Sequence, residues 1–353
     1  MLKTPHYFKA GLKGERPLVY HFFVLKAFFE IYFSNSKVNL PLDNKSDIDH
    51  SVSFHLEWKM SSKISPAVSL EARLSRQPSL FFFLVSAVFH YLGPAFAVVL
   101  FQRVAPLGVA WLRIATAALV FALFRKPWRV FLTLPRRDQR RLIAFGVVLA
   151  AMNSCFYLSI SVLPLGTVGA IEFLGPIILA VSRFRTARNF VSLSLAVAGV
   201  YFLTRIEITN ALVGYLFAFA NCVLFMLYVT IGHAIASSGV IAGADAIGSA
   251  MLIAMIAIVP IGIRDATVAF FNPVLLAAAA GVGISSSVIP YVCDQLAMKK
   301  LPAASFSLLL SLLPAMATAM GIVVLRQFPS GPQLVGLALV VAGVALHRPE
   351  IRS

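Results

Sequence analysis

Charged residues are scarce in this sequence. Only 12% of the 353 residues are Asp, Glu, Lys or Arg, whereas 59% are apolar, and ordinary soluble domains carry about 25% charged residues. A soluble fold of this size would leave large apolar patches exposed, while a bilayer solvates them directly. The mean hydropathy of +0.86 agrees. The composition therefore excludes a soluble protein and predicts an integral membrane protein.

Acidic residues are fewer still, with 14 Asp and Glu against 30 Lys and Arg, a net charge of +16. In a soluble protein this excess would indicate nucleic-acid binding. Here the cations after residue 79 lie mostly in short gaps between apolar runs, which is the pattern that orients membrane helices. We expect membrane lipid as a partner and no nucleic acid, and we interpret Arg136-Arg137 and Arg140-Arg141 as topology determinants facing the anionic inner leaflet.

Cysteines are few and catalytic motifs are missing. Cys155, Cys222 and Cys293 each lie inside an apolar run without CxxC or Cys/His spacing, so neither a disulfide framework nor a metal site is predicted. The sequence has no GxSxG, HExxH or P-loop motif. We therefore expect no enzyme and no cofactor, and any transport would draw on a gradient or be passive.

Residues 1–78 differ in kind from the rest of the chain. They hold half of the acids, and their one apolar patch, residues 18–33, contains Lys26 and Glu30 and is too short and too charged to span a bilayer. The patch starts late and no small-residue cleavage site follows it, which argues against a signal peptide. Two alternatives stay open: a disordered or interfacial tail, or a start assigned too early, with Met60 as the first residue.

From Ser79 onward, apolar runs alternate with short polar breaks, and each run is long enough, or nearly so, to cross roughly 30 Å of hydrocarbon as a helix. We count ten runs, at approximately 79–101, 107–124, 142–162, 165–182, 189–204, 211–232, 244–263, 274–298, 301–325 and 331–347. With the N-terminus inside, the inner loops and C-terminal tail hold fourteen Lys and Arg against four in the outer loops. Both termini are therefore predicted to be cytoplasmic.

Two patterns recur along the chain. A Leu-Pro followed by a second proline, with eleven residues between the prolines, occurs twice: Leu163-Pro164 with Pro176, and Leu301-Pro302 with Pro314. The segment LAVAGV at 195–200 likewise returns as LVVAGV at 339–344. Both matches are displaced by five helices, and because five is odd, tandem halves must enter the membrane from opposite sides. We predict an all-α fold of ten transmembrane helices in two inverted repeats, 79–204 and 211–347, with kinks at Pro176 and Pro314 pointing to a midplane site.

From about residue 79 to its end the chain resembles the ten-helix EamA-type transporters of the drug/metabolite transporter superfamily and, within it, the bacterial inner-membrane exporters of threonine and homoserine. The segments that carry the resemblance are Ala105–Arg113, Lys126–Arg129, Met152–Ile160, Val162–Gly166, Glu172–Pro176 and Lys300–Pro302. Two positions depart from the family. Leu313 stands where it usually has an acid, and Gln327 replaces the Glu of its Leu-Gly-Glu. Asp294 stands where the resembled exporters have a glutamate.

Four ionisable residues lie inside the predicted spans, namely Arg113, Glu172, Asp245 and Asp294. Each costs roughly 2.5–3.5 kcal/mol at mid-membrane, so each needs a partner or water. Arg113 and Glu172 both fall roughly 9–10 Å from the outer ends of their helices at 1.5 Å per residue. Three alternatives stay open: a structural ion pair, joint recognition of an amino-acid zwitterion with Glu172 on the ammonium and Arg113 on the carboxylate, or no contact at all.

Other polar residues are further candidates. Asp294, with Tyr291 and Gln295 beside it, either faces a cytoplasmic vestibule or snorkels, and Asp245 is interpreted as a helix-dipole partner or surface charge. The remaining polar points either line a site or join helices by hydrogen bonds: Asn153 with Tyr157, His90 with Tyr91, and Asn221 with Tyr228.

The resemblance implies a secondary carrier of the bacterial inner membrane that exports small amino acids of the threonine/homoserine type by alternating access, with a cavity drawing on helices 1, 3, 4, 6, 8 and 9. The intramembrane carboxylates favour protons as the coupling ion. Two rival functions stay open: a carrier for another metabolite or drug, such as a purine or sugar derivative, and a non-transporting membrane scaffold.

Overall fold

The computed structural model describes residues 79–183, 186–204, 208–241, 243–300 and 312–346, and within these ranges all regular secondary structure is helical. The predicted all-α class is therefore confirmed for the described part of the chain. The tail over residues 1–78, Met60 included, lies outside the described residues, as do Pro302 and the first part of the predicted ninth span.

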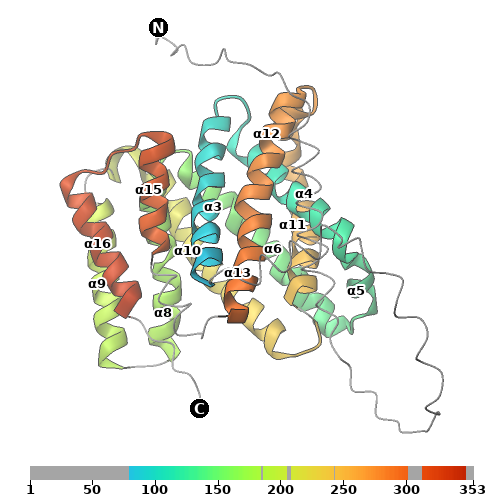
Figure 1. Cartoon of the computed structure of the whole chain (residues 1–353), viewed down its shortest axis with the longest axis horizontal. Coiled ribbons are helices and arrows are strands. Elements are labelled where there is room, and N and C mark those ends of the chain that lie inside the picture. Colours follow the sequence, from blue (N-terminus) through green and yellow to red (C-terminus); the bar gives the residue numbers. More distant parts are fainter. Residues whose placement is uncertain (1–78, 184–185, 205–207, 242, 301–311, 347–353) are drawn as a thin grey trace, which may run out of the picture. The chain divides into compact units, whose positions relative to one another are not determined.

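The described helices form the bundle shown in Figure 1. They are α3 (Ser79–Leu100), α4 (Pro106–Arg125), α5 (Pro127–Thr133), α6 (Arg136–Ile160), α7 (Leu165–Glu172), α8 (Leu174–Arg183), α9 (Ala187–Thr204), α10 (Ile208–Ser237), α11 (Gly243–Phe270), α12 (Pro273–Gly283), the π-turn η1 (Ile284–Val288), α13 (Ile289–Lys300), α15 (Leu313–Leu325) and α16 (Gly331–Leu346). In the bundle, α3 lies between α9 and α16 on one side and α4 and α5 on the other (Figure 1).

Six of the described helical stretches are long and apolar enough to cross a membrane: Leu80–Leu100, Pro106–Arg125, Arg136–Ile160, Ala211–Ala236, Gly243–Phe270 and Pro273–Asp294. Four shorter stretches are also apolar, at Leu165–Leu179, Ala187–Leu203, Leu313–Leu325 and Gly331–Leu346. The protein is thus a multi-pass helical membrane protein, and each predicted apolar run contains or overlaps one of these stretches.

Several boundaries differ from the sequence-based ones. Helix α6 starts at Arg136 rather than near 142, and α11 continues to Phe270 rather than ending near 263. Hydropathy detects only the apolar part of a helix, whereas Arg, Gln and Ala continue a helix beyond the hydrocarbon without penalty. Arg264, one of the four cations that the predicted boundaries assign to the outer loops, therefore lies on α11. Helix α5 was not predicted because seven residues are too few to show a period.

Near Pro176, where we predict a kink, the helix is interrupted between α7 and α8 at Phe173. Proline cannot donate to the carbonyl four residues earlier and its ring clashes with that carbonyl, which here belongs to Glu172. The chain therefore leaves the helix at the residue that follows Glu172. At the second predicted kink, Pro314 lies in the first turn of α15, next to the residues that are not described.

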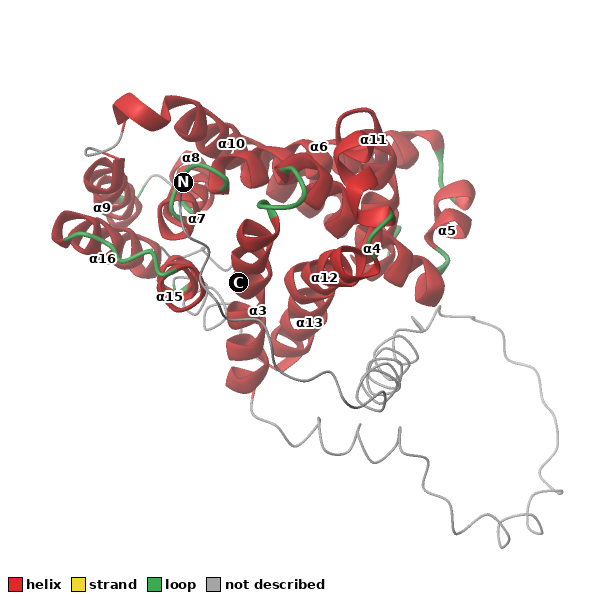
Figure 2. Ribbon diagram, turned by 90° about the horizontal axis from the view of Figure 1, so that it is seen from above, coloured by secondary structure: helices red, strands yellow, loops and turns green. Residues whose placement is uncertain are grey.

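Three helix pairs pack antiparallel at very short range. Gly108 at the start of α4 lies against Asp265 near the end of α11, while Gly262 lies against Trp111 and Leu107. Comparable contacts join α7 to α15 (Gly166 with Thr318, Gly169 with Ala317) and α9 to α16 (Gly199 with Gly336, Gly343 with Ser192). Figure 2 shows α7, α9, α15 and α16 grouped on one side of α3, and α4, α11 and α12 on the other.

Candidate functional site

Arg113, on α4, is held by neutral groups from two other elements. Its Nε donates to the Ser287 hydroxyl at 3.0 Å, its Nη1 to Asn153 Oδ1 at 2.6 Å, and its Nη2 to the Ser286 carbonyl at 3.2 Å. The Tyr157 ring lies next to the guanidinium, with 5.5 Å from the ring centroid to Cζ. The structure thus brings together three predicted site residues, Arg113, Asn153 and Tyr157, around a positive charge.

The π-turn η1 supplies two of these acceptors, and the sequence analysis missed it. A π-turn shifts the hydrogen-bond pattern of a helix by one residue, and such turns occur often at functional sites. Its Ser285-Ser286-Ser287 run inside an otherwise apolar span was the signal available in the sequence. Gly93 of α3 makes room for the turn, because a Cβ at Gly93 would collide with Ser286 Cβ and lie 2.8 Å from Ser286 N.

Glu172 ends α7 and forms the centre of a second polar cluster. It accepts a hydrogen bond from Asn221 Nδ2 of α10 at 3.3 Å. Asn221 and Tyr91 are both 0% exposed, and neither Asn221 Oδ1 nor the Tyr91 hydroxyl has a hydrogen-bond partner among the described residues. The Tyr91 hydroxyl lies beside Gly169, one turn before Glu172. Because an unsatisfied buried polar group costs about 1–3 kcal/mol, both groups have hydrogen-bonding capacity to offer to a further partner.

The two clusters share no hydrogen bond among the described residues, although Arg113 lies within electrostatic range of Glu172. His90 is within electrostatic range of Arg113, and its neighbour Tyr91 is within range of Glu172. Among the described residues no ion pair joins Arg113 to Glu172, and each finds neutral partners instead. Both side chains keep some accessible surface. Of the three alternatives from the sequence, a direct ion pair is not formed in this structure.

Asp294 and Tyr291 lie on α13, away from these contacts. Tyr291 packs edge-on against Phe121 of α4, with ring centroids 5.5 Å apart. Ser86 of α3 donates to the Pro290 carbonyl, one turn before Asp294, at 3.3 Å, and Asp294 keeps some accessible surface. Tyr228 stacks on Phe145 at 4.8 Å. Tyr291 and Tyr228 therefore make aromatic packing contacts between helices. That Asp294 faces a cytoplasmic vestibule stays a prediction.

Asp245, in the first turn of α11, makes a contact that the sequence did not predict. Its carboxylate accepts from Arg125 Nε at 2.7 Å and from Arg125 Nη2 at 2.9 Å, in the paired geometry that suits a guanidinium and a carboxylate. The two side chains are only 12% and 17% exposed. Asp245 therefore joins α11 to the end of α4 in addition to lying at a helix N-terminus.

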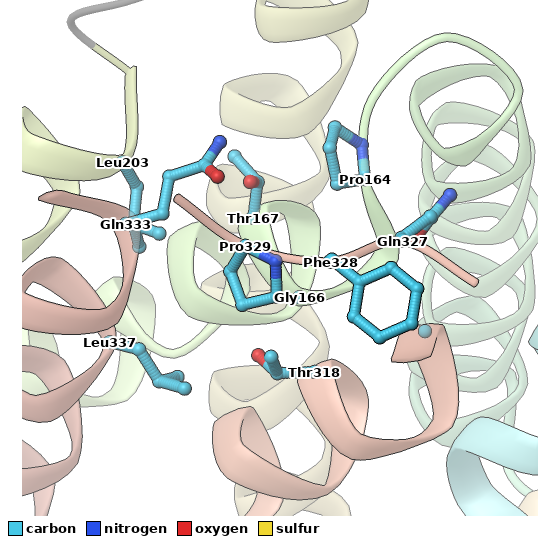
Figure 3. Close-up of a pocket in the computed structure, with 11 residues that line it drawn as sticks. Pro164, Gly166, Thr167, Leu203, Thr318, Gln327, Phe328, Pro329, Gln333 and Leu337 are labelled. Atoms are coloured by element: carbon cyan, nitrogen blue, oxygen red, sulfur yellow. The ribbon is translucent and has the colours of Figure 1, made fainter. Parts of the chain in front are cut away.

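A cavity of about 210 Å³ lies between the first turn of α7 and the segment after α15 (Figure 3). Thr167, Thr318, Gln327 and Gln333 give it a neutral polar lining. Gln327 Oε1 accepts a hydrogen bond from the Leu165 N–H at 3.1 Å. Gln327, noted above as a departure from the family, thus caps the start of α7.

An apolar helical bundle that holds a guanidinium and a carboxylate, each partly shielded from solvent, in separate polar clusters has the architecture of a membrane transporter. Residues 212–347 match the EamA-like transporter family. The threonine/homoserine exporter RhtA of Salmonella typhimurium (strain LT2) is 32% identical over 257 residues, covering 71% of this chain and 84% of the exporter. RhtA of Escherichia coli K12 is 32% identical over 253 residues with the same coverage. The chain belongs to the EamA-like transporter family. A crystal structure of a protein aligns at 19% identity and a TM-score of 0.49, covering 76% of this chain and 97% of its own.

Proposed function

We propose that the protein is a secondary exporter of small amino acids of the threonine/homoserine type, located in the bacterial inner membrane. It works by alternating access and exchanges its substrate for protons. Its ten transmembrane helices form two inverted five-helix repeats, with both termini in the cytoplasm. The RhtA relatives support the direction of transport and the substrate class, and the following features of the chain support the chemistry.

The uncompensated charge of Arg113 is the observation that carries the substrate assignment. A guanidinium has five N–H donors and stays protonated in proteins. Three of its donors are used by Ser287, Asn153 and Ser286, so one N–H on each terminal nitrogen is without a partner among the described residues. Two such donors match the two oxygens of a carboxylate. A cation inside a helix bundle is costly without an anion, and a substrate carboxylate supplies one.

The Glu172 cluster suits the other end of the same substrate. A primary ammonium has three donors and no acceptor. Glu172, Asn221 Oδ1 and the Tyr91 hydroxyl offer three oxygens, and the last two have no hydrogen-bond partner among the described residues. We therefore assign the substrate ammonium to Glu172 and its carboxylate to Arg113, with Asn153 and Tyr157 positioning the guanidinium. Glu172 and Asp294 are the carboxylates available to carry the exchanged proton.

Reciprocal contacts between α9 and α16 support the inverted repeat. The LAVAGV match pairs Gly199 with Gly343, 144 positions later, and the same offset pairs Ser192 with Gly336. In the structure Gly199 lies against Gly336, and Gly343 lies against Ser192. Exchanging the two halves therefore turns one contact into the other, as a two-fold axis requires. The antiparallel packing of α4 on α11 and of α7 on α15 has the direction that inverted halves need.

The test is counterflow in proteoliposomes with labelled threonine and homoserine, beside a purine and a sugar phosphate. We expect exchange of the amino acids and its stimulation by an opposing proton gradient. Glu172→Gln should abolish exchange while the protein still inserts. Exchange of the purine or sugar phosphate without dependence on Glu172 would instead identify a carrier for another metabolite. Absence of any flux would favour a non-transporting membrane scaffold.

A double variant separates binding from structure. If Glu172 only balanced the charge of Arg113, then Glu172→Gln would destabilise the protein, and adding Arg113→Gln would restore both folding and flux. Our assignment expects the double variant to be folded and inactive. Thermal unfolding in detergent provides the folding readout for all three variants.

A further inference from the structure

Helix α5 and the first turns of α6 form an exposed basic surface that the transport site does not use. It comprises the exposed cations Lys126, Arg129, Arg136, Arg137 and Arg140, together with Trp128 and Leu132. Trp128 is 46% exposed and Leu132 is 72% exposed. These two residues are four apart, so they share one face of α5. We call these seven residues the basic surface.

The basic surface is fixed to the bundle rather than carried on a loose loop. Pro127 is buried, and its carbonyl accepts a hydrogen bond from the Ser249 hydroxyl of α11 at 3.3 Å. Gln139 Nε2 of α6 donates to the Phe131 carbonyl at 3.0 Å. The Arg125–Asp245 ion pair lies directly before α5 in the chain. The surface therefore has a defined orientation on the transporter.

The positive charges of the basic surface repel one another. From Lys126 to Arg141 the chain has six cations and one acid, Asp138, whose carboxylate accepts a hydrogen bond from Arg141 at 3.3 Å. Arg136 and Arg140 are four residues apart on α6, where like charges repel. Arg136 and Arg137 also lie in the first turn, where the helix dipole disfavours cations. Intramolecular electrostatics therefore give no reason for these arginines, whereas an external anion does.

The fold itself can make the equivalent connection without such a surface. Under the proposed repeat, the link from α11 to α12 corresponds to the link from α4 to α6. It consists of Phe271 and Asn272, and Asn272 Oδ1 caps α12 by accepting from the Val274 and Leu275 N–H groups. Helix α5 and its cations are thus an addition to one half.

We propose that the basic surface binds the phosphate headgroups of anionic phospholipids. Only ten residues separate the ends of the apolar helices α4 and α6, so α5 stays where these helices leave the hydrocarbon. Exposed Trp and Leu beside Arg and Lys are typical of the interfacial layer of a bilayer. The identity of the leaflet, the cytoplasmic one, rests on the topology given under Proposed function.

The experiment measures lipid binding on purified protein in detergent, so the orientation in the cell does not affect it. Phosphatidylglycerol or phosphatidylcholine with the same acyl chains is titrated while thermal unfolding and native mass spectra are recorded. We expect phosphatidylglycerol to raise the unfolding midpoint and to stay bound. In Arg136→Gln/Arg137→Gln/Arg140→Gln its apparent affinity should fall by roughly a hundredfold, since each of the three cations near an anionic surface contributes about 1 kcal/mol.

The matched control removes three exposed cations from the opposite end of the bundle, as Arg103→Gln/Arg264→Gln/Arg326→Gln. It should retain the wild-type response to phosphatidylglycerol. An equal loss in both triple variants, or none in either, would overturn the proposal, as would preferential binding of an acidic peptide or of DNA over the lipid. If the first triple variant is not obtained, suppression of the wild-type response by 1 M salt, which shortens the screening length to about 3 Å, tests the same electrostatics.

Counterflow measured on the same samples keeps this inference separate from the transport proposal. A protein that binds phosphatidylglycerol through the basic surface but exchanges no amino acid would refute the transport proposal alone. A protein that exchanges amino acids and ignores headgroup charge would refute the lipid site alone.

Discussion

The contacts between α9 and α16 follow the internal sequence repeat, whereas the contacts of the polar interior do not. At the interface, corresponding residues make corresponding contacts, Gly199 with Gly336 and Gly343 with Ser192. In the interior the equivalence is lost. In the sequence, the match of Pro176 to Pro314 aligns Glu172 with Leu310. Arg113 of the first half has two of its hydrogen-bond acceptors on the serines of η1 in the second half. The sequence repeat thus accounts for the backbone packing of α9 on α16, whereas the substrate recognition that we propose rests on residues without a counterpart in the repeat.

The largest expected effect comes from filling the repeated interface. A Cβ at Gly199 would lie 2.5 Å from the Gly336 carbonyl oxygen, and backbone cannot move aside as a side chain can. Gly199→Leu should therefore destabilise the protein by about 3 kcal/mol or more. We expect little folded protein and a much lower unfolding midpoint in detergent.

The control for that change is Gly281→Ala on α12, where an added Cβ meets no heavy atom within 4 Å. It should stabilise the protein by about 0.5–1 kcal/mol, because alanine favours helix over glycine. A folded Gly199→Leu protein with a wild-type midpoint would show that the close α9–α16 packing is not needed.

The second prediction acts on the asymmetric site. Arg113→Lys keeps the charge but cannot reach Ser287, Asn153 and Ser286 together, nor offer two parallel donors to a carboxylate. Amino-acid exchange should fall about a hundredfold, which corresponds to about 2.7 kcal/mol. The protein should still fold, with a lower unfolding midpoint because lysine leaves some of these buried acceptors without a donor. Near-normal exchange would indicate that Arg113 supplies charge alone.

A third, smaller effect concerns the contact between α4 and α11. Because the Arg125–Asp245 pair is largely shielded from water and doubly hydrogen-bonded, Asp245→Asn should cost about 1–3 kcal/mol of stability. Arg125→Gln combined with Asp245→Asn should cost less than the sum of the single changes. Strict additivity in this double-mutant cycle would mean that the two side chains do not interact.

The smallest effect is expected at the start of α7. Gln327→Ala removes the acceptor of the Leu165 N–H, a loss comparable to that of a helix cap, about 1 kcal/mol. Gln327→Glu keeps the acceptor, adds a negative charge favourable to the helix N-terminus, and should leave the midpoint unchanged or slightly higher. Equal midpoints for the two variants would argue against the capping role.

Much of the fold could be read from the sequence. Apolar runs located the helical stretches because the hydrocarbon thickness fixes the length of a spanning helix. The spacing of Pro164 and Pro176 identified the interrupted helix, although the break lies at Phe173, because proline disturbs the turn before it. Polar helix extensions and α5 escaped detection, since charged and amphipathic residues carry no hydropathy signal for a helix.

The sequence identified several residues of the candidate site, but not the residues that they contact. Arg113, Glu172, Asn153 and Tyr157 stood out because polar residues are expensive in an apolar span. Their partners did not: Ser286, Ser287 and Asn221 lie 173, 174 and 49 positions from the groups that they contact. No local pattern encodes contacts at such separations.

What the sequence determined by itself was the membrane environment, the helical class and the residues that pay a desolvation cost, because each depends on composition or on periodicity along the chain. Only the tertiary structure decided that Arg113 and Glu172 are held in separate neutral clusters instead of in an ion pair. That choice depends on how α3, α6, α10 and η1 pack around them. The contact of α3 with η1 depends on close approach at Gly93, where an added Cβ would collide with Ser286, whose carbonyl accepts a hydrogen bond from Arg113.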